Sequence, residues 1–112
     1  MINSAIAEHY TWGQNCDGWK LVSHPGLTVI QERMPPGAKE VRHYHERALQ
    51  FFFVLSGVAT MEVNGSREMI MAGQGTEIPP GAPHQIFNEA PSDLEFLVIS
   101  QPSTQGDRVL AE

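Results

Sequence analysis

The chain of 112 residues has the length of a single domain, and with 41% hydrophobic and 18% charged residues its composition is that of a folded protein. The formal net charge of −6 argues against nucleic acid and anionic membrane surfaces as partners. Cys16 is the only cysteine, which excludes an internal disulfide, and the first residues lack the basic start and apolar run of a signal peptide. These features predict a cytoplasmic protein with no nucleic-acid or membrane partner.

Short runs with strand character follow one another along the chain, and no segment has a long helical periodicity. The expected strands are residues 19–24, 27–34, 39–45, 49–56, 58–63, 66–71, 76–78, 84–88 and 94–100. The pair Asn64-Gly65 is a hairpin signal, because a type I′ turn needs positive φ at both central positions. Strands spaced at about ten residues with turn chemistry between them predict an all-β sandwich or closed barrel.

The organisation along the chain is that of one domain, residues 1–112, without repeats or linkers. We expect the core barrel to occupy about residues 19–100. Residues 1–18 would form an N-terminal arm. The polar residues 101–112 would form a C-terminal tail over the surface.

Three histidines stand in positions suited to hold a metal ion. His43 and His45 are two residues apart in a strand pattern, so both side chains leave the same face. His84 opens another strand directly after a Pro-Gly turn. Imidazole is a good ligand for zinc, copper, iron and nickel. The amide oxygen of Gln50 could provide a fourth, neutral ligand, whereas we expect His9 and His24 to be structural or exposed.

The spacing around these residues is more specific than the histidines alone. One set, with five, one, four and six intervening residues, is Gly37, His43, His45, Gln50 and Gly57. The other, with five, one, two and three intervening residues, is Gly73, Pro79, Gly81, His84 and Asn88. Fifteen residues separate the two sets. Together they resemble the two motifs of the cupin superfamily at nine of ten fixed positions, with the short inter-motif segment of small single-domain cupins.

The resemblance implies a fold and a cofactor. The expected fold is all-β, a double-stranded β-helix or jelly-roll cupin barrel in a single domain. The expected cofactor is one divalent metal ion, Fe, Mn, Ni or Zn, held by His43, His45, Gln50 and His84. Gln50 is the one motif position that differs from the family pattern, since most metal-binding cupins have Glu there. A neutral Gln should weaken metal affinity but leave the ion a stronger Lewis acid; the alternative is that Gln50 only lines the pocket or supports a ligand.

The two faces of the strand expected at residues 49–56 should have different surroundings. If Gln50 points inward, Phe52 and Val54 also point inward, and with Met61 they would line an apolar pocket. The opposite face presents Leu49, Phe51, Phe53 and Leu55. Such a row must be covered by the N-terminal segment around Trp12, by a partner subunit, or by both. We expect a homodimer.

The resulting functional hypothesis is a metal-dependent enzyme of dioxygenase, isomerase or lyase type that acts on a small organic molecule in the barrel cavity. No catalytic acid or base is identified, and the direction of Glu32 and Arg33 remains open from the pattern. The alternative is a non-catalytic barrel that binds or senses a small molecule. No DNA-binding helical segment accompanies the barrel, which counts against a regulator.

Overall fold

The computed structural model describes all 112 residues as eleven β-strands with no helix, in two antiparallel sheets. The six-stranded sheet has the order β1 (Glu8–Trp12), β2 (Cys16–His24), β3 (Leu27–Met34), β10 (Leu94–Gln101), β5 (Leu49–Ser56), β8 (Gly75–Ile78). The five-stranded sheet has the order β11 (Arg108–Leu110), β4 (His43–His45), β9 (His84–Phe87), β6 (Val58–Val63), β7 (Ser66–Met71). The chain therefore contains no helix capable of crossing a membrane.

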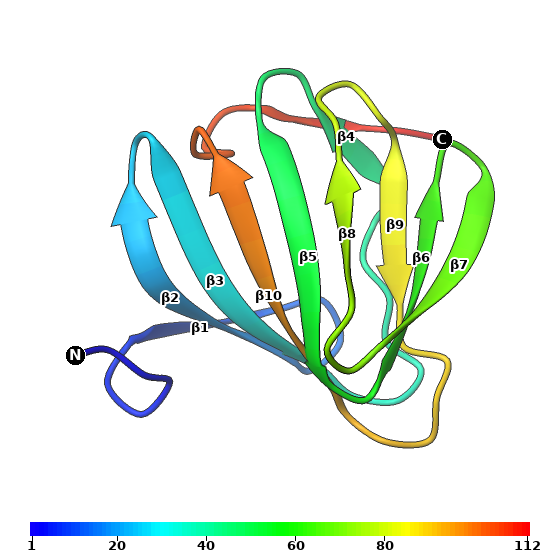
Figure 1. Cartoon of the computed structure of the whole chain (residues 1–112), viewed down its shortest axis with the longest axis horizontal. Helices are drawn as coiled ribbons and strands as arrows, with labels where there is room; N and C mark the ends of the chain where they lie inside the picture. Colours follow the sequence, from blue (N-terminus) through cyan, green and yellow to red (C-terminus); the bar gives the residue numbers. More distant parts are fainter.

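The two sheets face each other, with β2, β3 and β10 on one side of the molecule and β9, β6 and β7 on the other (Figure 1). This arrangement confirms the expected all-β jelly-roll fold. The expected hairpin is also present: Asn64 and Gly65 have φ values of 52° and 89°, and Val63 pairs with Ser66 across the turn.

Strands extend into both segments expected to lie outside the core barrel. β1 and the start of β2 belong to the N-terminal arm and pair from Glu8↔Lys20 to Trp12↔Cys16. In the C-terminal tail, β11 pairs with β4. Conversely, the strand expected over 39–45 is confined to His43–His45, with Lys39 forming only an isolated bridge. The bounds of these strands depend on pairing between segments far apart in the chain, and a local sequence pattern does not predict such pairing.

The core lies between the sheets, where alternate side chains of each strand point inward. On β10 the buried residues alternate with partly exposed ones. Cross-strand register places the inward residues of β10 beside those of β5 as Ser100↔Gln50, Val98↔Phe52 and Phe96↔Val54. Polar side chains thus meet at one end of this inner face, and apolar side chains fill the rows that follow.

The outward face of β5 carries the apolar row foreseen from the sequence. Phe51 is 37% exposed and Leu55 42% exposed. Leu97 and Ile99 of β10 pair with Phe53 and Phe51, which widens the apolar surface by one strand. The interpretation that Trp12 covers this face is wrong: Trp12 packs against the core cluster on the inner side, and its indole Nε1–H donates to the Asp17 carbonyl at 3.2 Å.

Candidate metal centre

The three histidines of the two motifs lie together inside the barrel. His43 and His45 leave the same face of β4, and His84 opens β9 directly opposite His43. Their exposed fractions are 6%, 6% and 0%. One ring nitrogen from each lies within 4.8 Å of those of the other two. Such a cluster of buried imidazoles has the spacing that a single metal ion requires.

Backbone carbonyl groups orient two of these rings. His43 Nδ1 lies 2.8 Å from the Val41 carbonyl oxygen, and His84 Nδ1 lies 3.1 Å from the Ala82 carbonyl oxygen. Because a carbonyl can only accept, each Nδ1 carries the proton and donates it, which leaves the Nε2 lone pair free. Metal-binding histidines are usually held by a bond of this kind through the second ring nitrogen.

The cluster favours neutral imidazoles. Burial lowers the pKa of His43 to about 4, and it also lowers the pKa of His45 and of His84. Each of His43 and His45 is further disfavoured as a cation by the neighbouring His84. At neutral pH the three lone pairs are therefore available to a metal rather than occupied by protons.

Gln50 lies on the opposite sheet and lines the same cavity as His43 and His45. Its side chain is 5% exposed. The amide Nε2 donates to Ser100 Oγ at 3.1 Å, a contact set by the Gln50↔Ser100 register. Since both amide hydrogens belong to Nε2, this bond leaves Oε1 as the free acceptor, and Oε1 has no protein partner.

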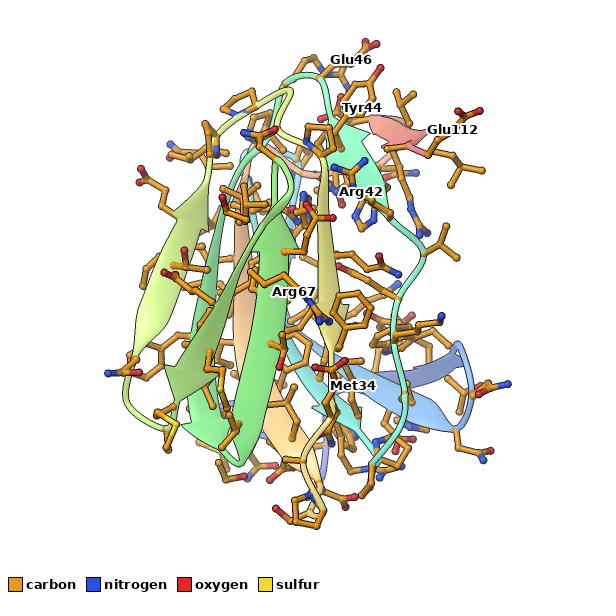
Figure 2. All side chains as sticks on the ribbon, turned by 90° about the vertical axis from the view of Figure 1, so that its right-hand side faces the viewer. Met34, Arg42, Tyr44, Glu46, Arg67 and Glu112 are labelled. Carbon is orange, nitrogen blue, oxygen red and sulfur yellow. The ribbon has the colours of Figure 1, made fainter.

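Arg42, directly before β4, and Tyr44 within it alternate with the histidines and lie on the outer side of this segment (Figure 2). Arg42 Nε contacts Glu62 Oε1 at 2.5 Å, and its Nη1 donates to the Glu112 carbonyl at 2.6 Å. These contacts tie the residue directly before β4 to β6 and to the chain end. Arg42 thus stabilises the segment that carries His43 and His45, and neither Arg42 nor Tyr44 lines the cavity.

The cavity beside the histidines has a volume of about 370 Å³. Phe52 lines it, as expected from the alternation along β5. Val54 and Met61 were expected to line it as well, but both are 1% exposed within the hydrophobic core cluster. Beyond Phe52, side chains such as Phe96 fill the space between the sheets. The cavity therefore ends before it reaches Val54 and Met61.

Carboxyl and phenol groups that sequence reasoning did not assign to the pocket also line this cavity, namely Tyr10, Glu32 and Glu40. Burial raises the pKa of Glu32 to about 8 and that of Glu40 to about 8. Glu32 shares the inner face of β3 with Met34, two residues later, which is fully buried in the structure. The direction of Glu32, left open by the sequence pattern, is thus inward. For Tyr10 and Glu40 no local pattern indicated the cavity.

The cavity lining includes two cationic side chains that form no ion pair. Five of the seven Lys and Arg side chains form ion pairs, and the five are Lys20, Arg33, Arg42, Arg47 and Arg67. Lys39 and Arg108 form none, and both line the cavity. Arg108 lies opposite His45 in the β4–β11 pairing. The cavity lining therefore holds two cationic side chains beside the carboxyl groups of Glu32 and Glu40, although the whole chain is acidic.

Asp107 fixes the loop that joins His45 to Gln50. Its carboxylate accepts hydrogen bonds from the backbone N–H groups of Glu46, Arg47 and Ala48 at 2.9–3.1 Å. Burial alone would raise the pKa of Asp107, but these bonds hold it below its usual value. No sequence pattern indicates this role, because Asp107 is about 60 residues from its partners.

We expect Asp107→Asn to lower the melting temperature and to weaken metal binding, since the loop loses its charged acceptor. A lowered carboxyl pKa contributes stability that is present above the unfolded pKa of about 3.9 and is lost as pH falls through the folded value. The melting-temperature gap between wild type and variant should therefore be widest near neutrality and narrow below about pH 4. A gap that stays constant between pH 7 and pH 2.5 would contradict this role.

Comparison with known proteins places the chain in a family. The family model described as a cupin domain matches residues 30–100, more than half of the chain. The chain belongs to the cupin family. Its barrel resembles the crystal structure of a predicted oxalate decarboxylase from Thermotoga maritima with a TM-score of 0.85 at 23% identity, over 92% of this chain and 99% of that one. That likeness concerns the fold.

Two curated proteins are similar in sequence. A mannose-1-phosphate guanylyltransferase of Klebsiella pneumoniae is 30% identical over 96 residues, which cover 86% of this chain and 20% of that protein. An oxalate-binding protein of Thermotoga maritima is 33% identical over 67 residues, which cover 60% of this chain and 55% of that protein. The chain thus matches only part of the length of either relative.

Proposed function

We propose that this cupin binds one divalent metal ion through His43, His45 and His84, with Gln50 as the fourth ligand. The ion would serve an enzyme that converts a small organic molecule in the cavity. The reaction would be of dioxygenase, isomerase or lyase type. The barrel would act as a homodimer that buries the outward apolar row of β5.

One observation carries the metal proposal. Only three buried side-chain nitrogen or oxygen atoms in the chain lack a hydrogen-bond partner, and they are His45 Nδ1, Gln50 Oε1 and His84 Nε2. All three belong to the proposed ligand set. A buried polar atom without a partner costs roughly 1–3 kcal/mol, so three of them at one site call for a shared partner. A metal ion is such a partner, because it accepts lone pairs from imidazole and amide oxygen alike.

When bound, a divalent ion supplies Lewis acidity toward an oxygen atom of the ligand. The chain's own contribution is to orient the donors: the Val41 and Ala82 carbonyls hold two imidazoles, and Ser100 holds the Gln50 amide. All four donors are neutral, so the protein leaves the charge of the ion undiminished.

The two unpaired cations of the cavity lining favour an anionic ligand. Lys39 and Arg108 are free to pair with a carboxylate, and Arg presents several donors to both oxygens of such a group. The name of the oxalate-binding relative supports the same ligand class. It also favours the second candidate function, a barrel that binds a small carboxylate without converting it.

Metal titration of the wild type and of two Gln50 variants tests the ligand set. We expect one ion per chain in the wild type, retained after dialysis against Fe, Mn, Ni or Zn. Gln50→Ala should keep more metal than His43→Ala, because a neutral amide is the weakest of the four donors. Gln50→Glu should bind more tightly, by about 10-fold or more, because it adds a charge beside the ion.

The outcomes separate the parts of the proposal. Wild-type protein that retains none of the four metals would refute the metal site. Equal affinity in the wild type, Gln50→Ala and Gln50→Glu would exclude Gln50 from the ligands while leaving the histidines. Elemental analysis of protein purified without added metal then narrows the reaction: Fe or Mn favours oxygenase chemistry, and Zn or Ni favours isomerase or lyase chemistry.

A further inference from the structure

One inner row of the six-stranded sheet holds an arrangement that the metal site does not use. The register places Tyr10 of β1 opposite Gly18 of β2, and Gly18 opposite Glu32 of β3. The Tyr10 hydroxyl donates to Glu32 Oε2 at 3.4 Å, across the position of the glycine. Tyr10 and Glu32 line the same cavity as His43, His45 and Gln50. A ligand that fills this space touches both the histidines and Glu32.

Gly18 makes this contact possible. A Cβ atom added at Gly18 would lie 2.2 Å from Tyr10 Cζ and 2.6 Å from its hydroxyl oxygen. The phenol ring therefore lies directly over the glycine, and any side chain there would displace it. Because the backbone of Gly18 does not have positive φ, space rather than backbone conformation accounts for glycine at this position.

Glu32 has no cationic partner, unlike most carboxylates that are removed from bulk water. Burial raises its pKa to about 8, and the hydrogen bond from Tyr10 opposes this rise. Near neutrality such a carboxyl group can both release and accept a proton. The titratable groups around it are Tyr10 from β1, Cys16 from β2, Lys39 and Glu40 before β4, His43 and His45 from β4, and Arg108 from β11.

We propose that Glu32 is the proton-transferring catalytic residue of this cavity and that Tyr10 is its positioning residue. The inference rests on the proposed function, since it needs a ligand held between the histidines and Glu32. Its substrate class is a small carboxylate with a carbonyl group, whose anionic end meets Arg108 or Lys39.

The proposed step is a proton abstraction next to the carbonyl. The C–H bond breaks, its proton passes to a carboxylate oxygen of Glu32, and its electron pair moves toward the carbonyl to give an enolate. The proton on Glu32 then exchanges with solvent. Delivery of a solvent-derived proton to the same carbon gives hydrogen exchange, and delivery to another carbon of a conjugated substrate gives an isomer. Atoms and charge balance without an oxidant or reductant.

Hydrogen–deuterium exchange tests the step without knowledge of the natural substrate. The probes are pyruvate, 2-oxobutanoate and 2-oxopentanoate in D₂O, with loss of the C3 proton signal followed by NMR in the presence of metal-loaded protein. Because general acid–base catalysis contributes about 100- to 10,000-fold, we expect Glu32→Gln to lose about 100-fold or more of the exchange rate while it keeps its metal. Glu77→Gln, an exposed carboxylate on β8, is the matched control and should exchange as the wild type does.

The positioning role of Tyr10 has its own readout. Tyr10→Phe removes the bond that lowers the pKa of Glu32, so the pH midpoint of exchange should move upward. Gly18→Ala should move it in the same direction by displacing the ring. A wild-type midpoint in both variants would overturn the role of Tyr10.

Two failures remain distinguishable. With one metal ion bound per chain, exchange in the wild type no faster than in Glu32→Gln for all three probes would overturn the inference and leave the metal proposal intact. Wild-type protein that holds no metal would refute the proposed function, and with it the inference that depends on it. Metal content measured on the same samples decides between the two.

Discussion

Replacement of His45 or His84 by Ala should each remove most of the bound metal. Both histidines have a buried ring nitrogen without a protein partner, which is available to an ion. Residues that merely support a metal ligand already change affinity by about 10- to 100-fold. Loss of a ligand itself should therefore weaken binding by at least about 100-fold, measured by titration and by elemental analysis after dialysis.

The controls address folding. His24→Ala removes an exposed histidine at the end of β2 and should leave metal content unchanged. Since His84 is fully buried, His84→Gln offers a variant of closer size and polarity, which should retain the fold by circular dichroism and still lose metal. If folded His45→Ala and His84→Ala bind as much metal as the wild type, the ion lies outside this histidine cluster.

Phe51→Asp should convert a homodimer into a monomer or an insoluble protein. The outward row of β5 is joined by Leu97 and Ile99 of β10, and Trp12 does not cover it. Burying one large apolar side chain contributes about 1.5–3 kcal/mol, and a two-fold axis buries the same row on both subunits. A carboxylate at Phe51 would be buried without a partner in such an interface, which should weaken the dimer by about 100-fold or more.

Light scattering at micromolar concentration measures the assembly. The wild type should have about twice the chain mass of 12.4 kDa. Soluble Phe51→Asp should have the mass of a single chain. Met69→Asp, at a 67% exposed position on the other sheet, is the control and should remain dimeric. A wild-type mass near 12.4 kDa would refute the homodimer. Phe53→Asp provides a second variant of the same row.

Features that depend on local spacing could be predicted from the order of the residues. The two-residue alternation of strands put His43 and His45 on one face, and the same alternation put Gln50 and Phe52 inside and Phe51 outside. The Asn64-Gly65 turn followed from the φ values that a tight hairpin needs. The motif spacing also identified His84 as the third histidine of the cluster, although 38 residues separate it from His45.

Which distant segments lie side by side became clear from the folded chain. Strand alternation tells which face a residue occupies, but not which strand is its neighbour or where an inner row ends. Val54 and Met61 face inward as expected, yet the packed core closes the cavity before it reaches them. Asp107 and Tyr10 lie in segments assigned to the tail and the arm, and their partners depend on register. Contacts of this kind depend on pairing between segments far apart in the chain, which brings together groups that share no local pattern.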